Sequence, residues 1–210
     1  ADGATEAGDG VIVDGDTVRI IAPGTYRLSG SLSDGQVVVA AEDDGVVRLV
    51  LDGVDITSAD DAPLVMTDAD QVVVWLEGGP THTLPAGLGD TTDTDTTEAT
   101  DTDTPNATLY STADLTIAGS GALTVTAAGN DGITSKDTLV VGGGTVAVTA
   151  PDDGLRGKDA LVIVGGDITL DVGGDGLTSD DTDADTGLGV GDITVAGGTI
   201  AITADTDASD

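Results

Sequence analysis

The sequence contains no cysteine and no phenylalanine, and its only aromatic residues are Tyr26, Tyr110 and Trp75. The absence of cysteine excludes disulfides as a source of stability. The scarcity of large rings argues against an ordinary globular core, in which aromatic side chains bury much of the apolar surface. The apolar residues are instead valine, isoleucine, leucine and alanine, and glycine occupies 32 positions. This composition favours a narrow core of stacked β-branched side chains connected by tight turns.

Basic residues are scarce as well, since six of them face 39 acidic residues and leave a formal charge of −33. This balance excludes nucleic acid as a partner, because phosphate binding needs a basic face. No apolar run is long enough to cross a bilayer, so no membrane insertion is expected. Nearly all of the acid is aspartate, the short carboxylate that suits turns and calcium loops. Adaptation to high salt would give the same composition and stays open as an alternative.

The chain begins at Ala1 rather than at a methionine, from which we expect that a leader has been removed. Calcium sites of weak affinity work outside cells, at roughly 10⁻⁴–10⁻³ M. We therefore expect an extracellular protein, either secreted or attached to the cell surface. Its length fits a single elongated domain over 11–210, preceded by an N-terminal tail at 1–10.

An internal repeat of about 22 residues determines the predicted fold. Residues 129–150 and 151–172 align without a gap, 173–204 restarts the pattern around an insertion, and 106–128 fits with one extra residue. Alternate positions in each unit are apolar and are predicted to face inward. These inward columns are Leu139, Leu161 and Ile193; Val141, Ile163 and Val195; Val146, Ile168 and Ile200; Val148, Leu170 and Ile202; and Ile133, Leu155 and Leu177.

Like residues stacked about 4.8 Å apart are typical of parallel strands. Because parallel crossovers are right-handed, we predict an all-β fold, a right-handed parallel β-helix (a solenoid) with coils of about 22 residues. An irregular N-terminal cap is expected at 11–32, irregular coils at 33–128, regular coils at 129–204 and a tail at 205–210. The low-complexity stretch at 87–104 is predicted to be an acidic loop within the irregular coils. His82 follows Pro80 in a stretch that is also predicted to be a loop.

The turn that opens each coil carries acidic columns. Asp131, Asp153 and Asp175 recur at one position, which Asp207 continues, and Asp137, Asp159 and Asp181 form a second column. Two carboxylates about 5 Å apart repel by roughly 1 kcal/mol in water and about 3–4 kcal/mol at an effective dielectric of 20. Either cations lie between the coils or some carboxylates are protonated, and at neutral pH we favour several bound calcium ions. The predicted ligands are Asp131, Asp137, Asp152, Asp153, Asp159, Asp175, Asp180, Asp181, Asp183, Asp185 and Asp207.

The alternating acids at 180–185 resemble a calcium loop, and a merely solvated acidic loop is the alternative. Three basic residues, Lys136, Arg156 and Lys158, lie beside the acidic columns. They either neutralise these acids or form a cationic patch that binds the carboxylates of uronic acids. Catalytic signatures are otherwise lacking, because cysteine is absent and the single histidine leaves little room for a Ser-His-Asp arrangement.

Several segments resemble a known family. They are APGTYRLSG at 22–30, RLVLDGVDIT at 48–57, PNATLYSTADLTIAGSGALTV at 105–125, NDGITSKDTL at 130–139, DDGLRGKDALVIVGG at 152–166 and GGDGLTSD at 173–180. They are similar to the calcium-rich β-helical carbohydrate-binding domains of secreted or lipid-anchored proteins from polysaccharide-degrading bacteria. The resemblance implies a right-handed parallel β-helix, several calcium ions and binding to cellulose and acidic, pectin-like sugars. With so few aromatic residues, a flat platform for crystalline cellulose is not expected, which favours acidic glycans.

Three functions follow as alternatives. The first is a non-catalytic, calcium-dependent polysaccharide-binding domain. The second is a structural protein whose coils associate end to end into a calcium-stabilised fibre, because no C-terminal cap is evident after the coil at 191–204. The third is a calcium-dependent polysaccharide lyase. Its base would be Arg156, which lies beside Asp153 and Asp159.

Overall fold

The computed structural model describes residues 9–87, 105–182 and 189–205. These residues form twenty β-strands and no helix, so the all-β prediction is confirmed. In this part of the chain, accordingly, no helix is long and apolar enough to cross a membrane. The predicted acidic loop at 87–104 lies outside the described residues except for Gly87, as do most of the predicted N-terminal and C-terminal tails.

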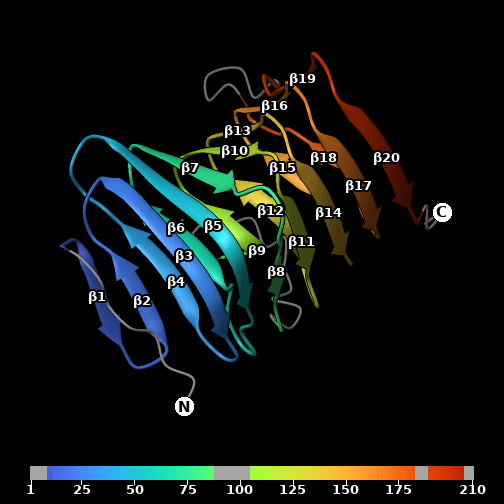
Figure 1. Cartoon of the computed structure of the whole chain (residues 1–210). Helices are drawn as coiled ribbons and strands as arrows, with labels where there is room; N and C mark the ends of the chain where they lie inside the picture. Colours follow the sequence, from blue (N-terminus) through green and yellow to red (C-terminus); the bar gives the residue numbers. More distant parts are fainter. Residues whose placement is uncertain (1–8, 88–104, 183–188, 206–210) are drawn as a thin grey trace.

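The strands form two sheets (Figure 1). The first sheet contains, in spatial order, β1 (Val11–Asp14), β2 (Thr17–Ile20), β4 (Gln36–Ala40), β6 (Leu64–Asp68), β9 (Ala107–Ser111), β12 (Asp131–Ser135), β15 (Leu155–Gly157) and β18 (Leu177–Thr178). The second contains β19 (Asp192–Val195), β16 (Ala160–Ile163), β13 (Thr138–Val141), β10 (Asp114–Gly119), β7 (Gln71–Leu76), β5 (Val46–Ile56), β8 (Thr81–Pro85), β11 (Ala122–Thr126), β14 (Thr145–Ala150), β17 (Asp167–Val172) and β20 (Thr199–Ala204), with β3 (Gly24–Leu32) also paired to β5.

Every described strand pair is parallel except the pair of β1 and β2. The chain visits the first sheet and then both arms of the second sheet, in the same order each time. Leu139 of β13 pairs with Leu161 of β16, which lies 22 positions further on. Leu161 pairs in turn with Ile193, 32 positions on, because ten residues are inserted between β18 and β19. Figure 1 shows the result, a stack of strands that runs from β1 at one end to β20 at the other.

The core lies between the two sheets and includes the predicted inward columns as far as Val172, together with apolar residues from the first half of the chain. Burial alternates along the strands, so that every second residue of β14 is buried. All five predicted columns are confirmed by the register of the strands, as in Val146 with Ile168 and Ile168 with Ile200. One continuous cluster of buried apolar side chains reaches from Ile20 to Val172.

Glycine pairs mark the corner between the two arms of the second sheet. Gly144 and Gly166 have φ angles of 89° and 106°, in the left-handed region that side chains with a Cβ rarely adopt. A Cβ on Gly166 would also lie 2.9 Å from the carbonyl oxygen of Gly144 in the preceding coil. The corner therefore needs glycine both for its backbone conformation and for the close approach of successive coils.

His82 lies in strand β8, so the prediction of a loop at this position is wrong. Its side chain is fully buried, and its backbone pairs with that of Leu123 in an inward column. The backbone N–H of Gly53 donates to Nδ1 at 3.1 Å, and Nε2 lies 3.4 Å from the carbonyl oxygen of Glu77. A neutral imidazole with its proton on Nε2 satisfies both contacts. Burial lowers the pKa of His82, although the Glu77 carbonyl and Asp52 oppose this effect.

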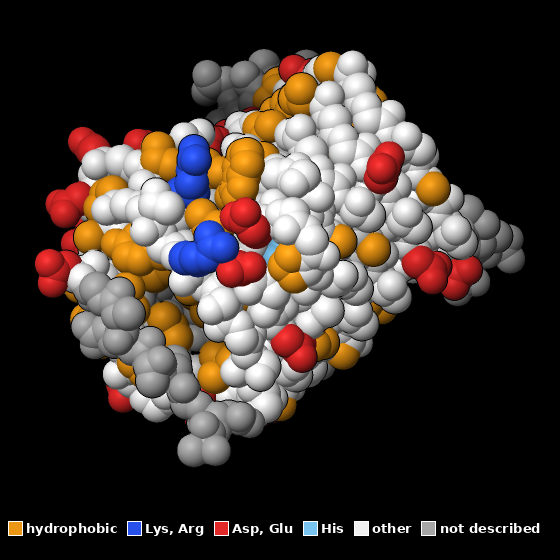
Figure 2. Space-filling model, in the orientation of Figure 1, with side chains coloured by type: hydrophobic (Ala, Val, Ile, Leu, Met, Phe, Trp, Pro, Cys, Tyr) orange, Lys and Arg blue, Asp and Glu red, His pale blue; other side chains and the backbone are white. Residues whose placement is uncertain are grey.

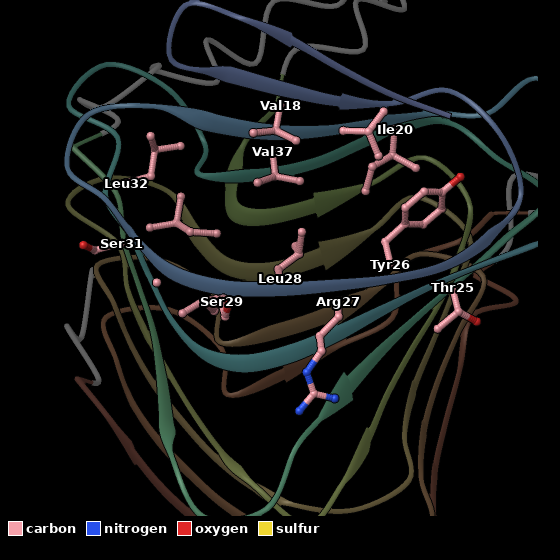
Figure 3. Close-up of a pocket in the computed structure, with 14 residues that line it drawn as sticks. Val18, Ile20, Thr25, Tyr26, Arg27, Leu28, Ser29, Ser31, Leu32 and Val37 are labelled. Atoms are coloured by element: carbon pink, nitrogen blue, oxygen red, sulfur yellow. The ribbon is translucent and has the colours of Figure 1, made fainter. Parts of the chain in front are cut away.

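The N-terminal end of the core is open. A cavity of about 550 Å³ lies there between β2, β3, β4 and β5. Figure 3 shows Val18, Val37 and Leu28 directed into this cavity, whereas Arg27 points away from it. The walls are the ends of the apolar columns, and we therefore interpret the cavity as the exposed end of the core rather than as a sugar site.

We predict that Leu161→Ala lowers the free energy of unfolding by about 2–5 kcal/mol, because it opens a cavity between two coils. The matched control is Val164→Ala, at an exposed position just after the same strand. It should change the free energy of unfolding by no more than about 0.5 kcal/mol. Urea unfolding of the three proteins measures both values. Equal effects of the two substitutions would contradict this account of the core.

Candidate functional site

The predicted column of Asp131, Asp153 and Asp175 is connected by hydrogen bonds through the backbone. The N–H of Asp153 donates to Asp131 Oδ1 at 3.3 Å, and the N–H of Asp175 donates to Asp153 Oδ1 at 2.8 Å. The carboxylates of Asp131 and Asp153 thus each accept the backbone N–H of the aspartate 22 positions later. The acids therefore connect successive repeats as well as repelling each other, which their charge alone does not predict.

The second oxygen of these carboxylates is also engaged. Thr134 Oγ1 donates to Asp131 Oδ2 at 2.8 Å, and Asn106 Nδ2 donates to the same atom at 3.2 Å. One coil later, Thr178 Oγ1 donates to Asp153 Oδ2 at 2.9 Å. The side-chain oxygen of Asn106 is buried and has no hydrogen-bond partner among the described residues. This polar cluster lies around the N-terminal end of β12, which is an interior strand of the first sheet.

Asp131 is the most buried of the predicted site residues, with 1% of its surface exposed. Burial raises its pKa to about 6; the Thr134 hydroxyl and Arg156 oppose the rise, and Asp153 adds to it. Asp131 therefore becomes protonated just below neutral pH. Protonation was one of the two ways, beside cation binding, in which the sequence was expected to relieve the repulsion between carboxylates. At pH 7 Asp131 is mostly ionised and costs the fold stability.

Arg156 lies between two acids on the outer side of this cluster. Its Nη1 is 3.7 Å from Asp131 Oδ2, and its Nη2 forms an ion pair with Asp180. Burial acts to lower the pKa of Arg156, but Asp180 and Asp131 outweigh that effect and hold the pKa above its usual value. Arg156 is therefore permanently protonated, and most of its surface is turned away from solvent.

The two lysines of the predicted cationic patch, unlike Arg156, take part in none of the ion pairs among the described residues. Lys136 is half-buried and Lys158 is exposed. Asp137 and Asp159 of the second acidic column lie beside them. Burial raises the pKa of Asp137, and the nearby carboxylates of Asp114 and Asp159 raise it further.

The described residues do not form a ready calcium cage. Within 9–87, 105–182 and 189–205, no group of three or more His, Cys, Asp or Glu side chains could hold one ion. Both oxygens of Asp131 already accept hydrogen bonds, and Asp180 is engaged by Arg156. Asp152, Asp159 and Asp175 are exposed, and Asp181 is half-buried. The predicted ligands Asp183, Asp185 and Asp207 lie outside the described residues.

A family model described as "carbohydrate-binding domain-containing protein" matches residues 14–210. The chain belongs to this family of carbohydrate-binding domains. The predicted resemblance is confirmed at that level.

Two relatives of this carbohydrate-binding domain are informative. A carbohydrate-binding domain-containing protein of Acetivibrio thermocellus is 38% identical over 76 residues, which span 36% of this chain and 27% of that protein. The solved structure of a polysaccharide lyase-like protein from C. thermocellum, a gadolinium derivative, is similar with a TM-score of 0.84 and 35% identity. The match covers 97% of this chain and 79% of that one.

The single tryptophan of this domain is a surface residue that was not among the predicted site residues. Trp75 is on the outer side of β7 and is 39% exposed, with the Arg48 guanidinium 5.8 Å from the centre of its ring. The signal was available, because Val72, Val74 and Leu76 alternate as buried residues and so place Trp75 outward.

We predict that Asp131→Asn changes how stability depends on pH. The folded-state pKa of about 6 exceeds the ordinary value of 3.8, so the folded protein binds the proton more tightly than the unfolded chain. Relative to Asp131→Asn, the unfolding free energy of the wild type should therefore rise by about 2.4 kcal/mol as the pH falls from 7 to 4. Urea unfolding at several pH values measures this difference. The titration of His82 contributes equally to both proteins and therefore does not affect it.

The exposed Asp171→Asn removes the same charge from β17 and corrects for the general effect of net charge. A difference that shrinks toward low pH would contradict the prediction. That result would indicate a bound cation, or a stronger contact with Arg156, that keeps Asp131 ionised.

Proposed function

We propose that this chain is a non-catalytic, extracellular polysaccharide-binding domain. The family match over residues 14–210 is the observation that carries this proposal. We also infer that the two sheets are walls of one right-handed parallel β-helix, and the 22-residue offset between Leu139 and Leu161 supports this inference. Such a fold offers long flat walls of strands, along which an extended glycan can lie across several coils.

Acidic glycans are the proposed class of ligand, with cellulose as a second candidate. Lys136 and Lys158 are the described cations of the predicted patch that carry no ion pair with a described acid, and so are able to engage uronate carboxylates. The formal charge of −33 opposes this binding, because a polyuronate is repelled by the protein as a whole. Binding to an acidic glycan should therefore depend on a bridging divalent cation.

Calcium is the proposed cation. The similar protein from C. thermocellum was solved as a gadolinium derivative, and gadolinium, like calcium, is a hard cation that prefers oxygen ligands. Because the described carboxylates form no cage, we propose that exposed acids such as Asp152 and Asp159 supply part of the coordination. Backbone carbonyls, water and the carboxylates of the glycan would supply the rest.

A lyase activity is less well supported than binding, although the similar solved structure is described as lyase-like. Arg156 is the base suggested by the sequence. A base must be able to lose its proton, and Asp180 and Asp131 hold the pKa of Arg156 above its usual value. Its ion pairs fit a structural role better than proton abstraction.

We predict that immobilised polygalacturonate retains the protein in about 1 mM calcium and releases it when the calcium is chelated. Cellulose, which carries no charge, should retain the protein equally with and without chelator if it binds at all. Retention is measured by depletion of protein from solution. If neither polymer retains the protein in calcium, the proposed function is overturned. If unsaturated uronides are released from polygalacturonate, the protein is a lyase instead.

A second candidate, end-to-end self-association, is favoured by the apolar surface of the last described coil. Ile193 and Val195 belong to inward columns yet are 47% and 54% exposed. Among the described strands, none pairs with the outer edges of β18, β19 and β20. The cavity at the opposite end, between β2, β3, β4 and β5, is a second apolar surface, and the two ends together allow head-to-tail stacking.

We predict that Ile193→Asp lowers the association of the full chain, measured as a concentration-dependent mass by light scattering. The control is Val164→Asp, which places the same charge at an exposed site off the axis of the stack. A wild-type protein that is monomeric at every concentration would exclude this second function.

A further inference from the structure

We propose that Trp75, together with Arg27 and Arg48, forms a saccharide-stacking site on the outer face of β3, β5 and β7. The inference rests on the proposed carbohydrate-binding function and locates the sugar on the wall formed by the second sheet. It differs from the predicted patch of Lys136 and Lys158, which follows strands β12 and β15 of the first sheet.

The strand register brings these residues together. Arg27 on β3 pairs with Val50 on β5, and Val50 pairs with Trp75 on β7, so the three form one row across neighbouring strands. The row continues to Ala118 on β10, whose short side chain does not cover the indole. The tryptophan therefore has an open edge toward the later coils, where the next sugar of a chain can lie.

Arg48 holds the indole ring in place. Its guanidinium lies 5.8 Å from the centre of the ring, within the range of a cation–π contact. An exposed tryptophan held in one orientation presents a rigid apolar surface at little entropic cost on binding. The C–H face of a pyranose ring is the ligand surface that fits an exposed indole, because both are flat and apolar.

Hydrogen-bonding groups surround this surface. Arg27 Nη2 lies 2.9 Å from Asp52 Oδ2, its Nε donates to the same oxygen at 3.1 Å, and its Nη1 is 3.6 Å from Glu77 Oε2. All three side chains are partly exposed, and ion pairs of this kind contribute little to stability. Their donors and acceptors are thus available to exchange with the hydroxyl groups of a bound sugar.

The charge pattern supports a binding role. Two of the six basic residues in a chain of charge −33 flank its only tryptophan. Figure 2 shows basic, acidic and hydrophobic side chains gathered on one part of this face, within a surface that is otherwise mostly uncharged. Arg48 and Arg27 also offer a partner to a uronate carboxylate, so the site accommodates either neutral or acidic pyranose units.

The experiment uses the full chain and two probes, a soluble cello-oligosaccharide and an oligogalacturonate in calcium. Because Trp75 is the only tryptophan, its fluorescence reports directly on this site. We expect either sugar to shift the emission, and we expect Trp75→Ala to weaken binding in calorimetry by about tenfold or more. Trp75→Phe, which keeps an aromatic face, should retain most of the affinity, and Val164→Ala should retain all of it.

The outcomes separate this inference from the proposed function. If the wild type binds neither these sugars nor the immobilised polymers, the proposed function fails together with the site. If the wild type binds a sugar with unchanged fluorescence and Trp75→Ala binds equally well, the inference is overturned while the function stands. Loss of binding in the double variant Lys136→Ala and Lys158→Ala would then assign the sugar to the first sheet. Thermal melting checks that each variant is folded.

Discussion

Parallel backbone pairing between successive repeats is the constraint from which the other features of this protein follow. It fixes each residue above its counterpart one coil earlier, as in Leu139 below Leu161. Once the register is fixed, apolar side chains form columns, glycines meet at one corner and acids accumulate in lines. A core so narrow has little room for large rings, and this explains why β-branched and leucine side chains fill it.

The same constraint explains how so acidic a chain tolerates its own charge. Carboxylates aligned by the register cannot separate, but the register also brings a backbone N–H to Asp131 and to Asp153. The Thr134 hydroxyl and the Asn106 side-chain amide donate further hydrogen bonds to Asp131, the most buried acid among the described residues. Charge repulsion is thereby reduced by local donors, and the remaining cost is expressed as the raised pKa of Asp131.

The sequence was sufficient to predict the later coils and insufficient for the earlier ones. Residues 129–172 repeat at one spacing, so alternation alone placed Leu161 and Ile168 correctly. In the first half the spacing changes from coil to coil, since Leu64 pairs with Leu109, 45 positions further on. His82 was assigned to a loop because polar and proline neighbours surround it. Only the paired strands reveal that it replaces an apolar residue in an inward column.

The candidate site was predicted less well than the fold. The acidic column was located correctly, but its chemistry depends on backbone N–H groups, which side-chain patterns do not report. Arg156 was predicted either to neutralise the acids or to bind uronate carboxylates, but its partners were not identified. One of them, Asp131, lies 25 residues earlier, and the other, Asp180, lies 24 residues later. Trp75 was passed over because the position of a single aromatic residue matters more for binding than the number of such residues.

The hydrogen bonds of the acidic column all have the same direction, with a carboxylate on one coil accepting the N–H of the coil that follows. A completed coil therefore presents acceptors already arranged for the next one, and a coil added in the opposite sense would find no donor. The column therefore has one direction along the stack of strands. A further repeat would need the same backbone N–H at this position, together with the parallel strand pairing and the apolar columns that join the other repeats.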